Sequence, residues 1–437
     1  MSASRRRYFG SSKLIFAFLA CCLIANIGRS EVPAALTHEE VTNRIRSGIA
    51  RLNEQYWSPT LSIWLDRPGD DLRAHYEGRR NPPWWPSANA VEALIDFMNA
   101  TGLSEYDAMI ESLYDLQKDP RARRTRLVAE LKRRNQWNAT DEQAWQRELQ
   151  KAVSTPASGY YSDFQNEYLD DSGWWSITWL KMYDRTGAAR YLATAKTIHA
   201  HMAKNWKPEK GGGVMWCEDE DKQRPNAITN NLFLILSARL YLRTGELAYL
   251  SWAEKTLEWI HAKDLYDGTA VVDAPGHRGD YWSYNQGTFI GGLTALYQAT
   301  GQLVYLDEAV KVSDSVLGRS GLTLPSGVII EKLGTGGDSA LFKGIFVRYL
   351  AQLREILVEG KLYPDAAREI DRCIQSSVES LLRNGIAEDQ LFSAEWQEGA
   401  KNRQTDFNTQ VSALAALIAV ESDADRPPLK AEEKPKP

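Results

Sequence analysis

The chain has 437 residues, of which 43% are hydrophobic and 25% charged, the composition of a globular protein with ample material for a large core. Its formal net charge is −5, and an acidic chain is a poor binder of nucleic acid, so we exclude that class of partner. Fifteen Trp and 19 Tyr accompany only 11 Phe. Aromatic rings with a polar group suit surfaces that are half apolar and half wet, such as surfaces that stack on sugars.

The N-terminus has the pattern of a secretory signal. Arg5, Arg6 and Arg7 precede an apolar run at 14–27 that is too short to span a membrane comfortably. We therefore predict a signal peptide over residues 1–30 and an exported protein, periplasmic or extracellular. Its removal would take away five positive charges and bring the formal net charge from −5 to −10. Cys21 follows a poor lipobox, so lipoprotein anchoring is the less favoured alternative.

No cofactor or metal site is predicted. The mature chain keeps only Cys217 and Cys373, which allow at most one disulfide and no cysteine-based metal site. The acidic run at 218–221 lacks the regular ligand spacing of a calcium site, and we interpret it as a loop.

Four segments share a pattern that predicts helical hairpins. Each contains an apolar helical stripe, the pair Thr-Gly, a Tyr four residues after the Gly, and a second apolar stripe. Their glycines are Gly102, Gly187, Gly245 and Gly301, separated by 85, 58 and 56 residues. Each Gly can adopt the left-handed conformation that ends a helix, after which the chain reverses. The longer first spacing indicates an insertion of roughly one helix, which we assign to the polar segment at about 119–152.

The remaining helical segments complete a set of six predicted hairpins. A looser fifth copy turns near Gly360, and an apolar helix at 409–420 pairs with an amphipathic one at 38–56. Twelve helices in six hairpins predict an all-α (α/α)6 toroid over residues 31–423, with short strands near 268–274 and 327–332. The tail at 424–437, rich in Pro, Lys and Glu, is predicted to be disordered.

In this toroid the helix before each Thr-Gly pair is an inner helix. The inner helices all begin from long loops on one face of the ring. These loops hold the most aromatic, glycine-rich and polar stretches of the chain, and loops of this kind tend to carry binding and catalysis. We expect a cleft there.

Asp170 and Asp171 are adjacent at the expected start of one inner helix, followed by Trp174 and Trp175. Helix capping is the common role of such a pair, because Asp at a helix N-terminus meets free amides and the helix dipole. A cap needs one side chain, however, and does not need two tryptophans. Two neighbouring carboxylates cannot ionise independently, and glycoside hydrolysis needs one protonated and one ionised carboxyl group.

The ordered motifs of the chain resemble glycoside hydrolase family 76, the endo-α-1,6-mannanases, and the resemblance covers nearly all of the mature chain. The motifs are "WWPSANAVEALIDF", "QNEYLDDSGWW", "GGGVMWCEDED", "NAITNNLFL", "YWSYNQGTFIGGL", "DSALFKGIFVRYLAQL" and "NTQVSALAAL". The resemblance implies an (α/α)6 barrel and a retaining mechanism with Asp170 as nucleophile and Asp171 as acid/base. It also implies α-mannan as the partner. The polar segment at 119–152 departs from the family pattern.

Further residues on the same face are candidates for binding sugar. Helix capping, loop bonding and core packing are competing roles for each of them. Besides Trp282, the candidates are Trp84, Trp85, Trp174, Trp175, Trp216, Asn230, Asn231, Tyr284, Asn285, Gln286 and Asp338.

An exported, monomeric mannanase has three alternatives. A transglycosylase would use the same residues, and the sequence does not separate the two. A sugar epimerase on this fold relies on several cleft histidines, whereas His199, His201 and His261 fall on expected outer helices and only His277 in a cleft loop. A non-catalytic sugar-binding toroid would tolerate the loss of one aspartate, and this chain keeps both.

Overall fold

The computed structural model describes residues 38–69, 71–154, 162–387 and 391–421. The predicted signal peptide and C-terminal tail lie outside the described residues. The α-helices are α1 His38–Tyr56, α2 Leu72–Tyr76, α3 Trp84–Thr101, α4 Asp107–Gln117, α5 Pro120–Arg133, α6 Ala139–Ser154, α7 Leu169–Thr186, α8 Ala189–Lys204, α9 Ala227–Thr244, α10 Leu247–Ala262, α11 Ser283–Thr300, α12 Leu303–Arg319, α13 Ser339–Glu359, α14 Pro364–Asn384 and α15 Phe407–Glu421. None of these helices combines the length and apolarity needed to cross a bilayer.

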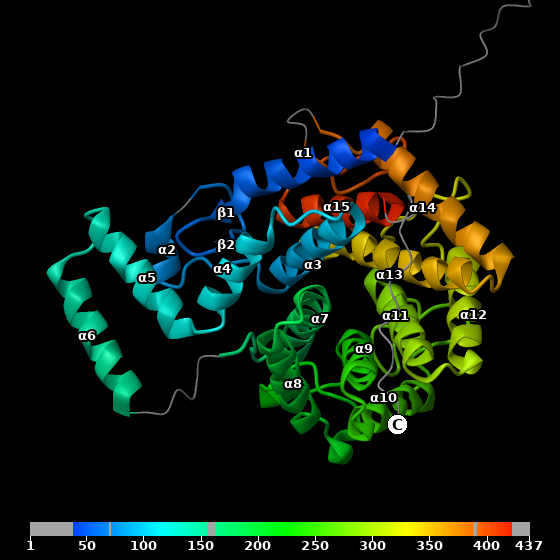
Figure 1. Cartoon of the computed structure of the whole chain (residues 1–437), viewed down its shortest axis with the longest axis horizontal. Helices are drawn as coiled ribbons and strands as arrows, with labels where there is room; N and C mark the ends of the chain where they lie inside the picture. Colours follow the sequence, from blue (N-terminus) through cyan, green and yellow to red (C-terminus); the bar gives the residue numbers. More distant parts are fainter. Residues whose placement is uncertain (1–37, 70, 155–161, 388–390, 422–437) are drawn as a thin grey trace, which may run out of the picture.

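Six of the helices form a closed inner ring. In the order α3, α7, α9, α11, α13 and α15, each packs against the next, and α15 returns to α3 (Figure 1). Outer helices α8, α10, α12 and α14 pack on the inner helices that precede them, and α1 packs on α15. The predicted (α/α)6 toroid is confirmed, including the pairing of the first helix with the last.

The Thr-Gly turns set the direction of the inner helices. Gly102, Gly187, Gly245 and Gly301 follow α3, α7, α9 and α11 with φ close to 70°, a conformation that costs glycine little. Short turns therefore lie on one face of the ring, and the inner helices begin on the opposite face, as predicted from the sequence.

The predicted size of the insertion was wrong. The segment at about 119–152 forms two helices, α5 and α6, which stand away from the ring in Figure 1. Asn135, with φ at 56°, adopts the left-handed conformation just after α5 and allows the chain to reverse within the polar segment.

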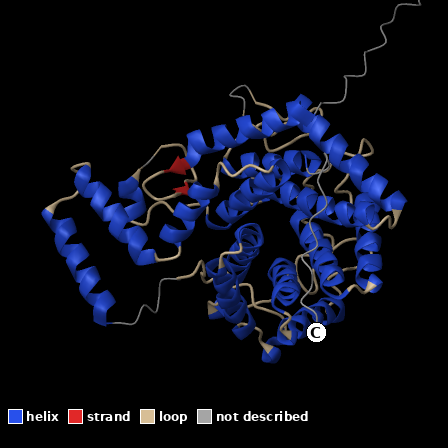
Figure 2. Ribbon diagram, in the orientation of Figure 1, coloured by secondary structure: helices blue, strands red, loops and turns tan. Residues whose placement is uncertain are grey.

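Strands are sparse in the described residues, as Figure 2 shows. The strands expected near 268–274 and 327–332 are reduced to isolated bridges, Tyr266 with Val271 and Thr323 with Ile329. The two-stranded sheet lies elsewhere, where β1 Trp57–Ser58 pairs antiparallel with β2 Ile63–Trp64.

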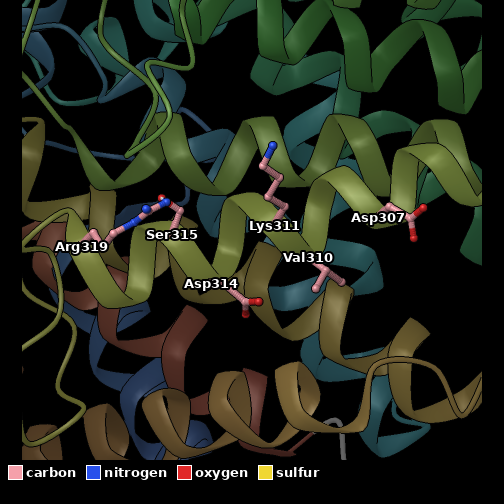
Figure 3. A pocket seen from close by; sticks show the side chains of 6 residues that line it. All are labelled: Asp307, Val310, Lys311, Asp314, Ser315 and Arg319. Atoms are coloured by element: carbon pink, nitrogen blue, oxygen red, sulfur yellow. The ribbon is translucent and has the colours of Figure 1, made fainter.

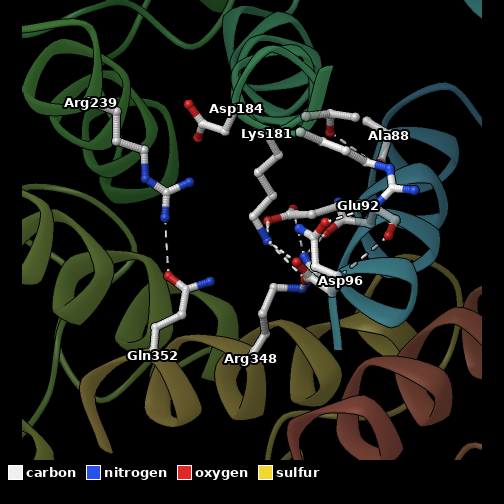
Figure 4. A network of polar contacts seen from close by, with 12 residues as sticks. Ala88, Glu92, Asp96, Lys181, Asp184, Arg239, Arg348 and Gln352 are labelled. Atoms are coloured by element: carbon white, nitrogen blue, oxygen red, sulfur yellow. Dashed lines mark hydrogen bonds and ion pairs between the residues drawn. The ribbon is translucent and has the colours of Figure 1, made fainter. Parts of the chain in front are cut away.

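A buried ionic network joins three inner helices inside the ring (Figure 4). Arg348 of α13 donates to the carboxylate of Glu92 on α3 at 2.7 Å and to Asn89 Oδ1 at 2.8 Å. Lys181 of α7 lies 2.7 Å from Glu92 and 2.8 Å from Asp96. Burial alone would raise the pKa of Glu92, but Arg348 and Lys181 bring it down to about 2. Glu92 is therefore ionised, and its charge is compensated from two sides.

We predict that Arg348→Ala lowers the free energy of unfolding by about 3–5 kcal/mol, because it leaves the buried Glu92 carboxylate short of a partner. The matched control is Arg383→Ala, which removes an exposed arginine 3.5 Å from Glu379 and should change stability by less than about 1 kcal/mol. Urea unfolding of both variants tests this. Equal unfolding midpoints would show that the network does not stabilise the ring.

Candidate active site

Asp170 and Asp171 occupy the first turn of α7, and each carboxyl group accepts one hydrogen bond from a side chain outside the helix. Trp216 Nε1 donates to Asp170 Oδ2 at 3.1 Å, and Asn166 Nδ2 donates to Asp171 Oδ2 at 2.6 Å. Both aspartates are half-buried. The N-cap residue, Tyr168, makes no side-chain capping bond. The first turn of α7 therefore presents two separately held carboxyl groups at the face where the inner helices begin.

Burial raises the pKa of both carboxyl groups. For Asp170 the pKa rises to about 7, although hydrogen bonds from Trp216 and from the amides of the first turn counteract the rise. For Asp171 the pKa lies well above its ordinary value, because the negative charge of Asp170 adds to the effect of burial. Because the two carboxyl groups are coupled, ionisation of one raises the pKa of the other, so the pair can hold one proton and one negative charge.

A third carboxyl group, Asp338, comes from the start of α13. Burial raises its pKa, and a hydrogen bond from the Trp85 side chain opposes that shift. Its negative charge in turn raises the pKa of both Asp170 and Asp171, which places it close to the pair. Three acidic side chains from the starts of α7 and α13 therefore lie close enough to influence one another's ionisation.

Tyr284, in the first turn of α11, lies beside these carboxyl groups. Its ring stacks on Phe342 with centroids 3.7 Å apart and planes 6° from parallel. Burial raises the pKa of Tyr284 well above its usual value, and the charges of Asp273, Asp170 and Asp338 raise it further. The hydroxyl therefore stays protonated and can donate a hydrogen bond.

The candidate tryptophans fall into two groups. The rings of Trp84, Trp85, Trp216 and Trp282 are half-buried. Trp174 and Trp175 are at most 2% exposed and belong to the core. Trp174 stacks on Trp85 and Trp175 packs against Trp84, so the buried pair supports the partly exposed pair.

The candidate asparagine and glutamine side chains also fall into two groups. Asn230 and Gln286 hold loops: each accepts from a backbone N–H and donates to the C=O of one loop residue, Val214 and Val271 respectively. Gln410 of α15 holds Phe392 in the same way.

Asn231 and Asn285 are different, although they too are buried. Their side-chain amide nitrogens donate to Asn285 O and to Asp273 Oδ1. Their Oδ1 atoms have no partner among the described residues. These two oxygens are free to accept a hydrogen bond.

Three side chains were not predicted from the sequence: Asn166, which contacts Asp171, Phe342, which stacks on Tyr284, and Glu331, which contacts the start of α11. Asn166 and Phe342 stand inside the quoted motifs "QNEYLDD" and "DSALFKG", so their positions were available as a signal. Glu331 accepts from the backbone amide and hydroxyl of Ser283 at the start of α11. Burial raises its pKa to about 7.

Two other features of the described residues are a surface depression and a pair of cysteines. A depression of about 430 Å³ is lined entirely by α12, from Asp307 to Arg319, on the outer ring (Figure 3). Cys217 and Cys373 are both free and buried, so they do not form a disulfide.

We predict that Asp170→Asn raises the melting temperature at pH 8 by several degrees. The pKa of the carboxyl group is about 7 in the folded protein and about 3.9 in the unfolded chain, so ionisation favours unfolding as pH rises. Below about pH 4 both states are protonated and the gain should vanish. Asp115→Asn, at a carboxyl that is 64% exposed, is the control. A gain that does not vary between pH 4 and pH 8 would contradict this explanation.

Comparison with known proteins identifies the family. The sequence model of glycosyl hydrolase family 76 matches residues 134–432. The mannan endo-1,6-alpha-mannosidase DCW1 of Saccharomyces cerevisiae is 25% identical over 276 residues, which are 57% of this chain and 59% of that protein. The mannan endo-1,6-alpha-mannosidase DFG5 of the same yeast is 24% identical over 275 residues, 57% of this chain and 58% of that protein. The chain thus spans somewhat more than half the length of these relatives.

Solved structures share the fold. An inactive variant of the alpha-1,6-mannanase GH76A of Salegentibacter sp. HEL1_6, in complex with alpha-1,6-mannotetrose, superposes with a TM-score of 0.67 at 24% identity. The match covers 88% of this chain and 99% of that one. Dfg5 of Chaetomium thermophilum, in complex with glucosamine, gives a TM-score of 0.68 at 20% identity, with 90% and 93% covered. With the family model matching well over half of its residues, the chain belongs to glycosyl hydrolase family 76.

Proposed function

We propose that this protein is an exported, retaining endo-α-1,6-mannanase. The observation that carries the proposal is the pair of adjacent carboxyl groups at the start of α7, held by different donors and both raised in pKa. Membership of a family of glycosyl hydrolases gives the reaction class. The names of the yeast relatives supply the linkage, α-1,6 between mannose units.

The neighbouring solved structure supports the roles of the pair. In the Salegentibacter mannanase, the inactive variant carries alanine in place of two consecutive aspartates. Asp170 and Asp171 are the consecutive aspartates of this chain that lie at the start of an inner helix. We propose that the activity of this protein depends on Asp170 and Asp171 in the same way.

The first half of the reaction uses the pair in its resting protonation state. Ionised Asp170 attacks the anomeric carbon and forms a covalent mannosyl ester, while protonated Asp171 gives its proton to the departing glycosidic oxygen. Trp216 Nε1 holds Asp170 Oδ2 at 3.1 Å and favours its ionised form. The hydrogen bonds to Asp170 lower its pKa, which suits the nucleophile, and the negative charge of Asp170 raises the pKa of Asp171, which suits the acid.

The second half reverses the role of Asp171. Once it has lost its proton, it removes one from an incoming water, and the water oxygen displaces Asp170 from the anomeric carbon. Two inversions at that carbon return the α configuration. Asp171 ends protonated and Asp170 ends ionised, ready for the next substrate.

Sugar binding is assigned to groups that remain accessible or unsatisfied around the pair. The rings of Trp84, Trp85 and Trp216 are partly exposed and can stack on pyranose faces. Hydroxyl groups of the sugar can donate to Asp338, Asn231 Oδ1 and Asn285 Oδ1 and accept from Tyr284. We assign Trp174, Trp175, Asn230 and Gln286 a supporting role behind these groups, because their rings or amides are buried or engaged by the protein.

We predict that Asp170→Asn and Asp171→Asn each reduce hydrolysis of linear α-1,6-mannan by at least about 10²-fold, since neither carboxyl can replace the other. Reducing ends are followed against α-1,2- and α-1,3-linked controls, with melting curves to verify folding. If either single variant is folded and keeps near wild-type turnover, the pair serves only as a helix cap and the proposal is contradicted.

Product stereochemistry and acceptor addition complete this test. Proton NMR of the first products should show α-mannose, and β-mannose appearing before mutarotation would exclude the retaining mechanism. With a good leaving group and added azide, Asp171→Asn should yield an α-mannosyl azide. Transfer to an added mannoside in preference to water would identify a transglycosylase.

We predict that Trp216→Phe shifts the acidic limb of the kcat/KM profile upward by roughly one pH unit. The variant keeps an aromatic ring but loses the Nε1 donor that favours ionised Asp170. Wild type should lose activity as pH falls through about 7, where Asp170 takes up its proton, and at high pH, where Asp171 loses its own. An unchanged acidic limb in Trp216→Phe would assign that limb to a different group.

A further inference from the structure

Asn166 makes a short contact with the catalytic pair and has no role in the proposed chemistry so far. Its Nδ2 lies 2.6 Å from Asp171 Oδ2. Its Oδ1 accepts from the backbone N–H of Tyr168 at 3.1 Å, two residues along the chain. Since that N–H can only donate, the oxygen of the amide must face it and the nitrogen must face Asp171.

The loop that carries Asn166 is held from both sides. After it, Leu169 N donates to Trp216 O and Glu218 N donates to Glu167 O. Before it, the fully buried ring of Phe164 lies in an aromatic cluster with Trp175 and Trp179, at centroid distances of 4.9 and 4.7 Å.

The backbone before Asn166 is strained. Asp163 and Phe164 have φ at 54° and 63°, in the left-handed region that costs a non-glycine residue of order 1–2 kcal/mol. Asp163 N also donates to Lys118 O at 3.0 Å. The packing of Phe164 holds this conformation, and it delivers Asn166 to a defined place beside Asp171.

We propose that Asn166 is a positioning residue for Asp171: it orients the carboxyl group and restricts Oδ2 to accepting, so that Oδ1 carries the catalytic proton. An amide N–H cannot accept a proton from Oδ2, so the acid must donate through its other oxygen. When Asp171 acts as the base, the same N–H stabilises its negative charge. The inference rests on the proposed function, because it gives Asp171 the acid/base role.

Other charged groups face this site and must be considered in any pH measurement. The negative charges of Asp170, Asp338 and Glu167 raise the pKa of Asp171, whereas the hydrogen bond from Asn166 lowers it. His201 of α8 bonds the backbone of Asn166, and its Nε2 lies 3.8 Å from Glu218. Burial lowers the pKa of His201.

The variant that tests the proposal is Asn166→Asp. An aspartate keeps the size of the side chain and the acceptor for Tyr168 N, but it replaces the donor to Asp171 by an oxygen. The matched control is Asn402→Asp. Asn402 makes the same turn, with Oδ1 accepting from Gln404 N at 3.0 Å, but its Nδ2 donates to Thr335 Oγ1, whose hydroxyl can rotate to donate instead.

We predict that Asn166→Asp lowers kcat/KM on α-1,6-mannan at least about 10-fold and moves the alkaline limb of its pH profile upward. Asn402→Asp should change neither. With a dinitrophenyl α-1,6-mannobioside, whose leaving group needs no acid, the loss in the glycosylation step should shrink. If Asn166→Asp keeps wild-type rates and the wild-type alkaline limb, Asn166 only holds its turn and the proposal is overturned.

A second measurement tests the contact between Asn166 and Asp171 without relying on enzyme turnover. The Asp171 carboxyl is titrated by carbon-13 NMR in wild type and in Asn166→Ala, with Asp171→Asn to assign the signal. Loss of the donor should raise the pKa of Asp171, and an unchanged pKa would overturn the proposal. A wild-type protein that leaves α-1,6-mannan uncut would reject the proposed function, while this titration would still decide whether Asn166 controls Asp171.

Discussion

Closing a ring of helices brings together parts of the chain that are far apart in sequence, and here a buried charge pair joins them. Glu92 and Arg348 are separated by 256 positions, yet they lie 2.7 Å apart inside the ring, and Lys181 completes the compensation of charge. Any one of these charges without its partners would cost several kcal/mol, so the network favours one mutual arrangement of α3, α7 and α13. The relative placement of the loops at the starts of these helices depends on that arrangement.

Polar side chains have two different roles at the face of the ring where the inner helices begin. Amides such as Asn230 and Gln286 satisfy loop backbone, which fixes the path of the loops. Asp170 and Asp171, in contrast, destabilise the folded protein. Burial raises the pKa of both carboxyl groups, so their ionisation disfavours the folded state as pH rises. The stability of the surrounding structure offsets that cost.

Much of the fold was readable from the sequence because its repeat has a local physical cause. Each Thr-Gly pair ends a helix through a left-handed glycine, and this signal depends on neighbours in the chain alone. The size of the insertion was misjudged because Asn135, and not a glycine, makes its internal turn. Side-chain roles were harder to predict. Asn230 and Asn231 are adjacent and identical in type, yet one holds Val214 and the other keeps a free acceptor, a difference set by which side of α9 meets the loop. Asn166 stands in the same motif as Asp171, but the contact between the two side chains depends on a strained loop conformation that the motif does not reveal.

The pairing of α1 with α15 has a consequence for how the molecule is made. The last helix, α15, closes the inner ring onto α3 and packs against α1, where the side chain of Thr42 donates to Glu421. During synthesis the chain therefore carries an open arc whose exposed apolar faces find their partners only when the final helix has emerged. Contacts of such long sequence separation form slowly. A polypeptide with this topology therefore cannot complete its ring until α15 has been synthesised.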